Sequence, residues 1–175
     1  MFLGRPLPIY AADEPIAELE PAELFVTCIA RLWVLHHRDP QTVPADWRAG
    51  VAHMHISREA EDGFDALFAL LAASAVRKID IRCKCCPHLG DDEAWLLQLV
   101  CLLPNDRLAE AAAILGDWLP PIAVRRGLGP AQGFAAGLAV RGLIVPPRQA
   151  GPAAWRPRQP KPTSARPTGG TERRR

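Results

Sequence analysis

The densest group of chemically reactive side chains in this chain is the run Cys83-Lys84-Cys85-Cys86-Pro87-His88. It contains three of the five cysteines and one of the five histidines. Thiolates and imidazoles are preferred zinc ligands, and the thiolate is also the form of cysteine that reacts with oxidants. The run therefore predicts either a metal site or a redox-active thiol site.

A zinc site here would need a ligand from outside the run. Cys83 and Cys86 have the C-x-x-C spacing of many structural zinc sites, and His88 follows closely. The adjacent Cys85 and Cys86 side chains diverge, so all four groups would strain around one tetrahedral ion. We expect Cys83, Cys86 and His88 to bind, with His53 or His55 as the fourth ligand. Further candidates for the fourth position are Cys28, Cys101, His36 and His37, of which the two cysteines lie on predicted apolar helix faces.

The redox alternative uses Cys83, Cys85 and Cys86. The flanking Arg82 and Lys84, and a helix predicted to begin just after the run, would each stabilise a thiolate and lower its pKa. The acidic residues 91–93 would act in the opposite direction. A further interpretation is that these cysteines only pack beneath a loop, because small thiol side chains are common in protein interiors.

Positive charge is concentrated at the C-terminal end. Residues 147–175 contain eight Arg or Lys and one acid, a charge of +7, so the preceding part carries 2 − 7 = −5. This segment is rich in proline and poor in apolar residues, which predicts disorder. A flexible basic tail favours non-specific contact with a polyanion such as nucleic acid, although it can also be a solubilising extension. The residues assigned to polyanion contact are Arg156, Arg158, Lys161, Arg166, Arg173, Arg174 and Arg175.

The elements that position the cysteine run are predicted to be helices, because apolar residues recur every three to four positions. They cover about residues 15–38, 57–75, 91–103, 105–119 and 130–143, with shorter helices after Pro44 and around residues 122–128. An extended segment is expected near residues 78–82.

Local signals refine these helices. Ser57 is a predicted N-cap, Asp91 or Asp92 caps the next helix, and Pro130 is expected to open the last one. The stretch Trp95–Leu103 is apolar nearly all round, which predicts a central buried helix. Gly133 and Gly137 would allow close approach of a neighbouring helix.

The whole chain is predicted to be a mainly α protein, a compact single-domain bundle of five to six helices. Residues 1–13 form an extended lead-in, 14–146 the helical domain and 147–175 the tail. We expect a cytoplasmic protein without membrane spans, because the sequence shows neither a secretory signal nor a long apolar stretch. The odd number of cysteines argues against a disulfide framework. The Ala, Arg, Gly and Pro content suggests a bacterial source.

No catalytic motif is evident, which predicts a non-enzyme. The leading hypothesis is a regulatory or adaptor protein, whose helical body binds an unidentified protein partner and whose tail contacts a polyanion, stabilised by zinc if the metal is bound. The alternative is a cysteine-based redox or metal sensor. A third is a DNA-binding regulator, since residues 108–126 resemble a helix-turn-helix in outline, with Ala112, Gly116 and Ile122 at its core positions and Arg125 and Arg126 following. Asp117 at an inward position and Pro120-Pro121 depart from that pattern.

Overall fold

The computed structural model describes residues 10, 13–39 and 46–148, and this part of the chain is built from α-helices without a β-strand. The mainly α prediction is therefore confirmed. The helices are α1 (Pro21–Arg38), α2 (Trp47–His53), α3 (Arg58–Ser74), α4 (Asp91–Leu102), α5 (Leu108–Trp118) and α6 (Pro121–Val140), with short 3₁₀ turns at Ile16–Glu18 and Leu103–Asn105.

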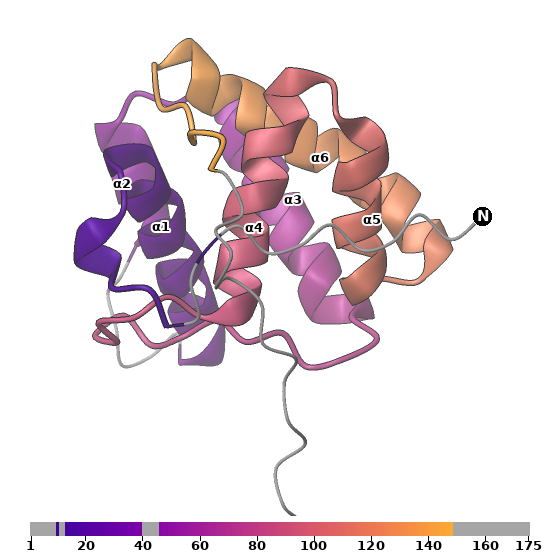
Figure 1. Cartoon of the computed structure of the whole chain (residues 1–175), viewed down its shortest axis with the longest axis horizontal. Coiled ribbons are helices and arrows are strands. Elements are labelled where there is room, and N and C mark those ends of the chain that lie inside the picture. Colours follow the sequence, from indigo (N-terminus) through magenta and orange to yellow (C-terminus); the bar gives the residue numbers. More distant parts are fainter. Residues whose placement is uncertain (1–9, 11–12, 40–45, 149–175) are drawn as a thin grey trace, which may run out of the picture.

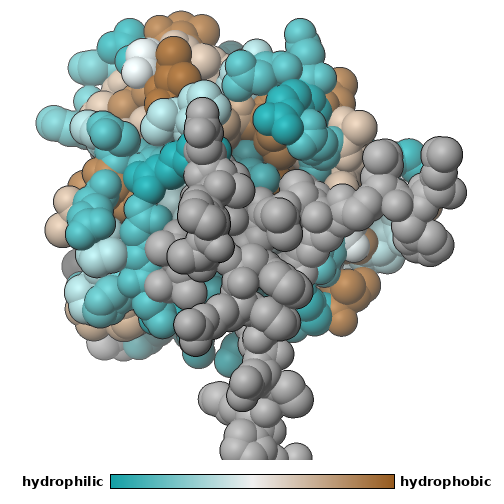
Figure 2. Space-filling model, in the orientation of Figure 1, coloured by the Kyte–Doolittle hydropathy of each residue, from teal (hydrophilic) through white to brown (hydrophobic). Residues whose placement is uncertain are grey.

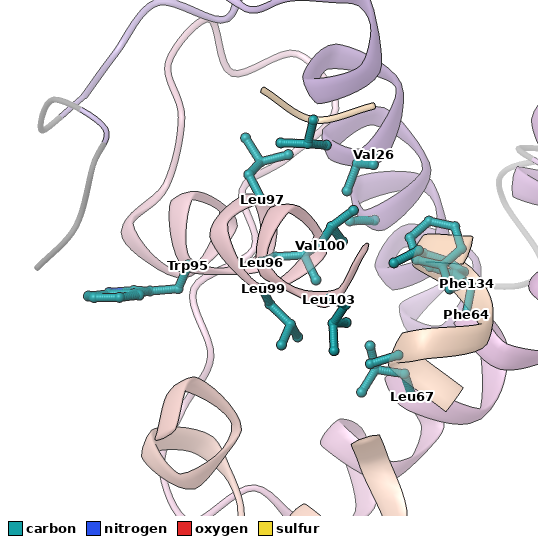
Figure 3. Packing of buried hydrophobic residues seen from close by; sticks show 14 of the residues in the cluster. Val26, Phe64, Leu67, Trp95, Leu96, Leu97, Leu99, Val100, Leu103 and Phe134 are labelled. Atoms are coloured by element: carbon teal, nitrogen blue, oxygen red, sulfur yellow. The ribbon is translucent and has the colours of Figure 1, made fainter. Parts of the chain in front are cut away.

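Helix α4 occupies the centre of the fold. In Figure 1 it lies between α1 and α2 on one side and α5 and α6 on the other. Every residue from Asp92 to Leu102 is buried, as the nearly continuous apolar pattern predicts. Figure 3 shows Leu96, Leu97, Leu99 and Val100 leaving the helix in several directions to contact its neighbours. The helix that follows the cysteine run is thus fixed in the core.

Helices α3 and α6 pack closely along their lengths. The rings of Phe64 and Phe134 meet with their centroids 4.9 Å apart, and both side chains face each other in Figure 3. A Cβ on Gly63 would lie 2.7 Å from the Pro130 carbonyl oxygen, and a Cβ on Gly137 would overlap Ala60. Gly133 meets nothing within 4 Å. Close approach of a neighbouring helix is therefore confirmed at Gly137 and wrong at Gly133. Gly63 of α3 also allows close approach and was not predicted to do so.

The prediction that Pro130 opens a separate helix is wrong. Residues 121–140 form one helix, with Pro120 and Pro121 at its start and Pro130 inside it. Proline removes one helical hydrogen bond, but the extensive contact with α3 stabilises the continuous helix in spite of that cost.

The other predicted boundaries agree in part. The helix predicted from about residue 15 begins only at Pro21, because Leu19 and Glu20 are extended, whereas the predicted C-terminal ends are close to the observed ones. Helix α1 ends at Arg38, before Asp39-Pro40, and the Ser57 hydroxyl accepts a hydrogen bond from the Ala60 N–H at 3.3 Å. Helix α4 differs, because its N-cap is Gly90 and Asp91 is already helical. Residues 78–82 form neither helix nor strand, in agreement with the extended segment expected there.

Among the residues that Figure 2 colours by hydropathy, hydrophilic ones prevail, and hydrophobic ones lie over the C-terminal end of α6 and along the right-hand side. The exposed hydrophobic side chains around that end of α6 are Val140 and Ile144. None of the helices in the described residues is sufficiently long and apolar to cross a bilayer.

Candidate functional site

The cysteine run forms a loop between the extended segment and α4. We call residues 83–90 the cysteine loop. Its backbone pairs with the segment before α1: the Ile16 N–H donates to the Pro87 carbonyl at 2.9 Å, and the Leu89 N–H donates to the Glu14 carbonyl at 2.8 Å. Within the loop, the Cys86 N–H donates to the Cys83 carbonyl at 3.1 Å and closes a turn. These hydrogen bonds therefore fix the backbone conformation of the cysteine loop.

A buried ion pair anchors this loop to the core. Arg31 of α1 and Glu93 of α4 form two hydrogen bonds at 2.7 and 2.8 Å, and their side chains are 2% and 0% exposed. The same guanidinium donates to the carbonyl oxygens of Cys86 and His88, at 2.7 and 2.8 Å. Arg31 thus holds two backbone groups of the cysteine loop through its planar fork of donors.

The Glu93 carboxylate fixes both ends of the cysteine loop. It accepts a hydrogen bond from the Arg82 N–H at 3.1 Å, just before the loop, and one from the Gly90 N–H at 2.7 Å, at its end. Together with Arg31 these donors satisfy both carboxylate oxygens, as a buried charge requires. One buried pair therefore sets the position of the whole loop.

The Cys83 thiol is the most activated group in this loop. Cys83 and Cys85 are exposed, and their sulfur atoms lie 3.3 Å apart, while Cys86 is half-buried. Hydrogen bonds from the Cys86 and Cys85 side chains, with further support from the backbone N–H groups of both residues, lower the pKa of Cys83 to about 7. The contact with Cys83 raises the pKa of Cys86. The loop thus places a thiol that is partly ionised near pH 7 beside Cys86, whose raised pKa favours its protonated form.

Arginines neutralise the carboxylates that follow the loop. Asp92 accepts hydrogen bonds from Arg77 at 2.6 and 2.9 Å, from the Asp80 N–H at 2.7 Å and from the Trp118 indole N–H at 3.0 Å. Burial acts to raise the pKa of Asp92, but these donors outweigh it and hold the pKa below its usual range. Because Arg31 pairs with Glu93 in the same way, two of the three acids expected to oppose a thiolate are compensated.

A groove of about 990 Å³ adjoins the cysteine loop, with Cys83 and Cys86 in its wall. Its apolar lining comes from α1, α3 and α4 and includes Trp33, Phe68, Leu71 and Leu96. Basic side chains from the end of α1 and from the segment between α3 and the cysteine loop line it as well; these are Arg38, Arg77, Lys78 and Arg82. A reactive thiol therefore borders a space large enough for a small molecule.

The predicted zinc ligands are not brought together in the described residues. No group of three or more His, Cys, Asp or Glu side chains there is placed to hold one metal ion. His88 is exposed on the cysteine loop, and His53 and His55 are exposed at the C-terminal end of α2. The zinc hypothesis stays an untested prediction, without a ligand set in this part of the chain.

Other candidate residues are placed as follows. Cys101 is buried, whereas Cys28, expected on an apolar face, is exposed. Ile122, which the helix-turn-helix outline requires inside, is 64% exposed, and Asp117 accepts hydrogen bonds from Arg77. The predicted polyanion contacts, from Arg156 to Arg175, lie outside the described residues.

Arg31 and Glu93 were not among the site residues predicted from the sequence. Arg31 stands among apolar positions of the α1 pattern, where a lone arginine signals a buried partner. Glu93 was grouped with the acids of a helix start, and nothing in its spacing separates it from Asp91. The sequence therefore contains a signal for Arg31 but none for Glu93.

Comparison with family models, curated protein sequences and solved structures finds no match to this chain.

Proposed function

We propose that this protein is a thiol-based redox-responsive regulator, with Cys83 as the reactive cysteine and Cys85 or Cys86 as its resolving partner. The observation that carries the proposal is the exposed pair of sulfur atoms, Cys83 and Cys85, at 3.3 Å on a loop whose backbone is fixed. Among the hypotheses drawn from the sequence, the redox sensor fits this geometry best.

The chemistry needs a peroxide or a disulfide as oxidant. With hydrogen peroxide, the Cys83 thiolate attacks one oxygen, and after proton uptake the products are a sulfenic acid and water. A neighbouring thiol then attacks the sulfenic sulfur, which forms the disulfide and releases a second water molecule. An external thiol reverses the process by exchange.

Formation of this disulfide would change the structure of the loop, and two contacts would transmit that change to the rest of the molecule. Cys83 and Cys86 line the groove, and the Cys86 carbonyl accepts a hydrogen bond from the buried Arg31. A bond between neighbouring loop sulfurs changes the turn that holds both groups, since disulfide geometry is specific. The regulated property is therefore the shape of the groove wall.

The test is a count of free thiols after mild peroxide treatment of the full-length protein. We expect two thiols to be lost and recovered with a reducing agent, and peptide mapping to join Cys83 to Cys85 or Cys86. Cys83→Ser should abolish the loss, while Cys28→Ser, which removes an exposed thiol outside the loop, should not. Retention of all loop thiols in the unsubstituted protein, or equal loss in Cys83→Ser, would contradict the proposal.

Binding of a protein partner by the helical body, polyanion contact by the tail and a structural zinc remain hypotheses.

A further inference from the structure

The groove beside the cysteine loop has the features of a binding site for the molecule that oxidises it. Its volume of about 990 Å³ is at the upper end of the range of small-molecule sites. Its apolar floor is rigid, since Trp33 and Leu96 are 4% and 2% exposed and belong to the core. A groove built on such a floor persists without a ligand, so that a ligand would bind to a preformed site.

The charged groups of the groove favour an anionic occupant. The lining carries four basic residues, Arg38, Arg77, Lys78 and Arg82, and two acidic ones, Asp80 and Asp92. The buried Asp92 is compensated by Arg77, and Arg82 is paired with Asp13 at 2.7 Å. Arg38 and Lys78 form no ion pair with any other described residue, and both side chains are exposed. Asp80 offsets one of these charges, so the lining keeps a positive excess.

The reactive Cys83 lines the same groove as these basic side chains. Cys83 lines the groove and is exposed, and the exposed Lys84 follows it directly. An anionic molecule attracted to the groove would therefore lie beside the thiol. Exchange with a disulfide requires such an approach, because the attacking sulfur must reach one sulfur of the bond in line with the other.

We infer that Cys83 is a site of mixed-disulfide formation with a low-molecular-weight disulfide that carries carboxylate groups, bound in the groove of Cys83, Arg38 and Lys78. The inference rests on the proposed redox function and names the class of oxidant. Carboxylates of the ligand interact with the basic side chains, and its apolar portion covers the floor formed by Trp33 and Phe68.

The exchange is balanced without another reactant. The Cys83 thiolate attacks one sulfur of the disulfide R–S–S–R, forming Cys83–S–S–R and releasing RS⁻, which takes up a proton. The thiolate of Cys85 or Cys86 then attacks the Cys83 sulfur and releases the second RS⁻. The net reaction converts one small disulfide and two protein thiols into two small thiols and one protein disulfide.

Two probes distinguish a selective site from an exposed thiol. Oxidised glutathione is the anionic probe and 2-hydroxyethyl disulfide the neutral one, each reacted with the reduced full-length protein at pH 7. A synthetic peptide of residues 80–89 serves as reference for each probe, since it keeps the local charges of the loop but lacks the groove. The Cys85→Ser/Cys86→Ser variant traps the mixed disulfide, whose position is found by mass spectrometry.

For each probe, the rate constant of the protein is divided by that of the peptide. We expect this ratio to be about three- to tenfold larger for the anionic probe than for the neutral one, since exposed charge pairs contribute modestly. Lys78→Gln combined with Arg38→Gln should remove most of this preference. Arg126→Gln removes one positive charge from the exposed face of α6 and should leave the preference for the anionic probe unchanged.

The inference is overturned if the normalised preference is absent, or if Arg126→Gln lowers it as much as the groove variants. Such a result leaves the redox function standing when peroxide still oxidises Cys83. If peroxide also leaves the loop thiols intact, the proposed function itself fails.

Discussion

At the scale of single residues, the reactivity of Cys83 depends on its neighbours within one turn. The two adjacent thiols and the backbone N–H groups of Cys85 and Cys86 stabilise its thiolate. Cys101 provides the contrast, because burial raises its pKa. The same side chain therefore has opposite chemistry at two positions of one molecule.

The first prediction concerns the pH dependence of alkylation. The fraction of Cys83 present as thiolate should rise with pH through a midpoint of about 7, since its pKa is lowered to that value. Iodoacetamide labelling followed by peptide mapping measures the rate at each pH. Cys101 should label slowly over the whole range below pH 9, because it is buried and protonated. A Cys83 profile that starts to rise only above pH 8 would contradict this picture.

The residue pattern indicated the redox cysteines but not what compensates the acids near them. Arg82, Lys84 and the nearby helix start were expected to stabilise the thiolate, whereas its main stabilisation comes from the loop itself. Spacing along the chain cannot show that Arg77 reaches Asp92, because the two are separated by 15 positions and an irregular segment.

At the scale of elements, the cysteine loop is positioned by two helices that lie far apart in the sequence. Arg31 and Glu93 are 62 positions apart, and their pairing brings α1, α4 and the loop together. The presence of the helices and most of their C-terminal ends follow from local periodicity and capping, whereas the continuity of α6 through Pro130 does not. This pairing does not, since it depends on which faces of α1 and α4 meet in three dimensions.

The second prediction is that Arg31→Met strongly destabilises the fold. The change leaves the Glu93 charge buried without its partner, and loss of one member of such a pair costs about 3–5 kcal/mol. Urea unfolding followed by tryptophan fluorescence measures the free energy of unfolding. Arg107→Gln breaks the exposed pair with Glu110 and should change stability far less. Similar effects for both variants would argue against the anchoring role of Arg31.

The third prediction concerns the α3 and α6 contact. Gly137→Ala places a methyl group against Ala60 and should destabilise the protein by about 1–3 kcal/mol. Gly133→Ala, four residues earlier on the same helix, meets no neighbouring atom and should stabilise it by about 0.5–1 kcal/mol through helix propensity. Thermal unfolding of both variants provides the comparison. Stabilisation by both substitutions would mean that α3 and α6 lie farther apart than the close approach of Gly137 to Ala60 indicates.

At the scale of the whole molecule, charge is divided between an acidic body and basic C-terminal residues. Arg148 belongs to the body: it pairs with Glu14 and Glu23, and Glu23 also accepts a hydrogen bond from the Tyr10 hydroxyl at 2.8 Å. The tail predicted from residue 147 therefore has its first basic residue packed on the domain. Charge counting could not reveal this, since it treats all arginines alike.

The fourth prediction concerns the basic residues after Arg148. If they bind polyanions, the triple variant Arg173→Gln, Arg174→Gln and Arg175→Gln should lower single-stranded DNA affinity and reduce the slope of log affinity against log salt by about two. Fluorescence anisotropy at several salt concentrations measures both. Arg126→Gln serves as a single-charge control on the folded body. An unchanged slope in the triple variant would remove polyanion contact as a role of these residues.

The cluster of Tyr10, Glu14, Glu23 and Arg148 also bears on the order of folding. It joins residues 134 positions apart, and a contact across so long a loop carries a large closure entropy. The helical hairpins can form first from nearer contacts, and this cluster then completes the native state. Amide groups beside it, such as that of Leu89, should accordingly exchange with deuterium sooner than those of the central helix, which open only when the entire core unfolds.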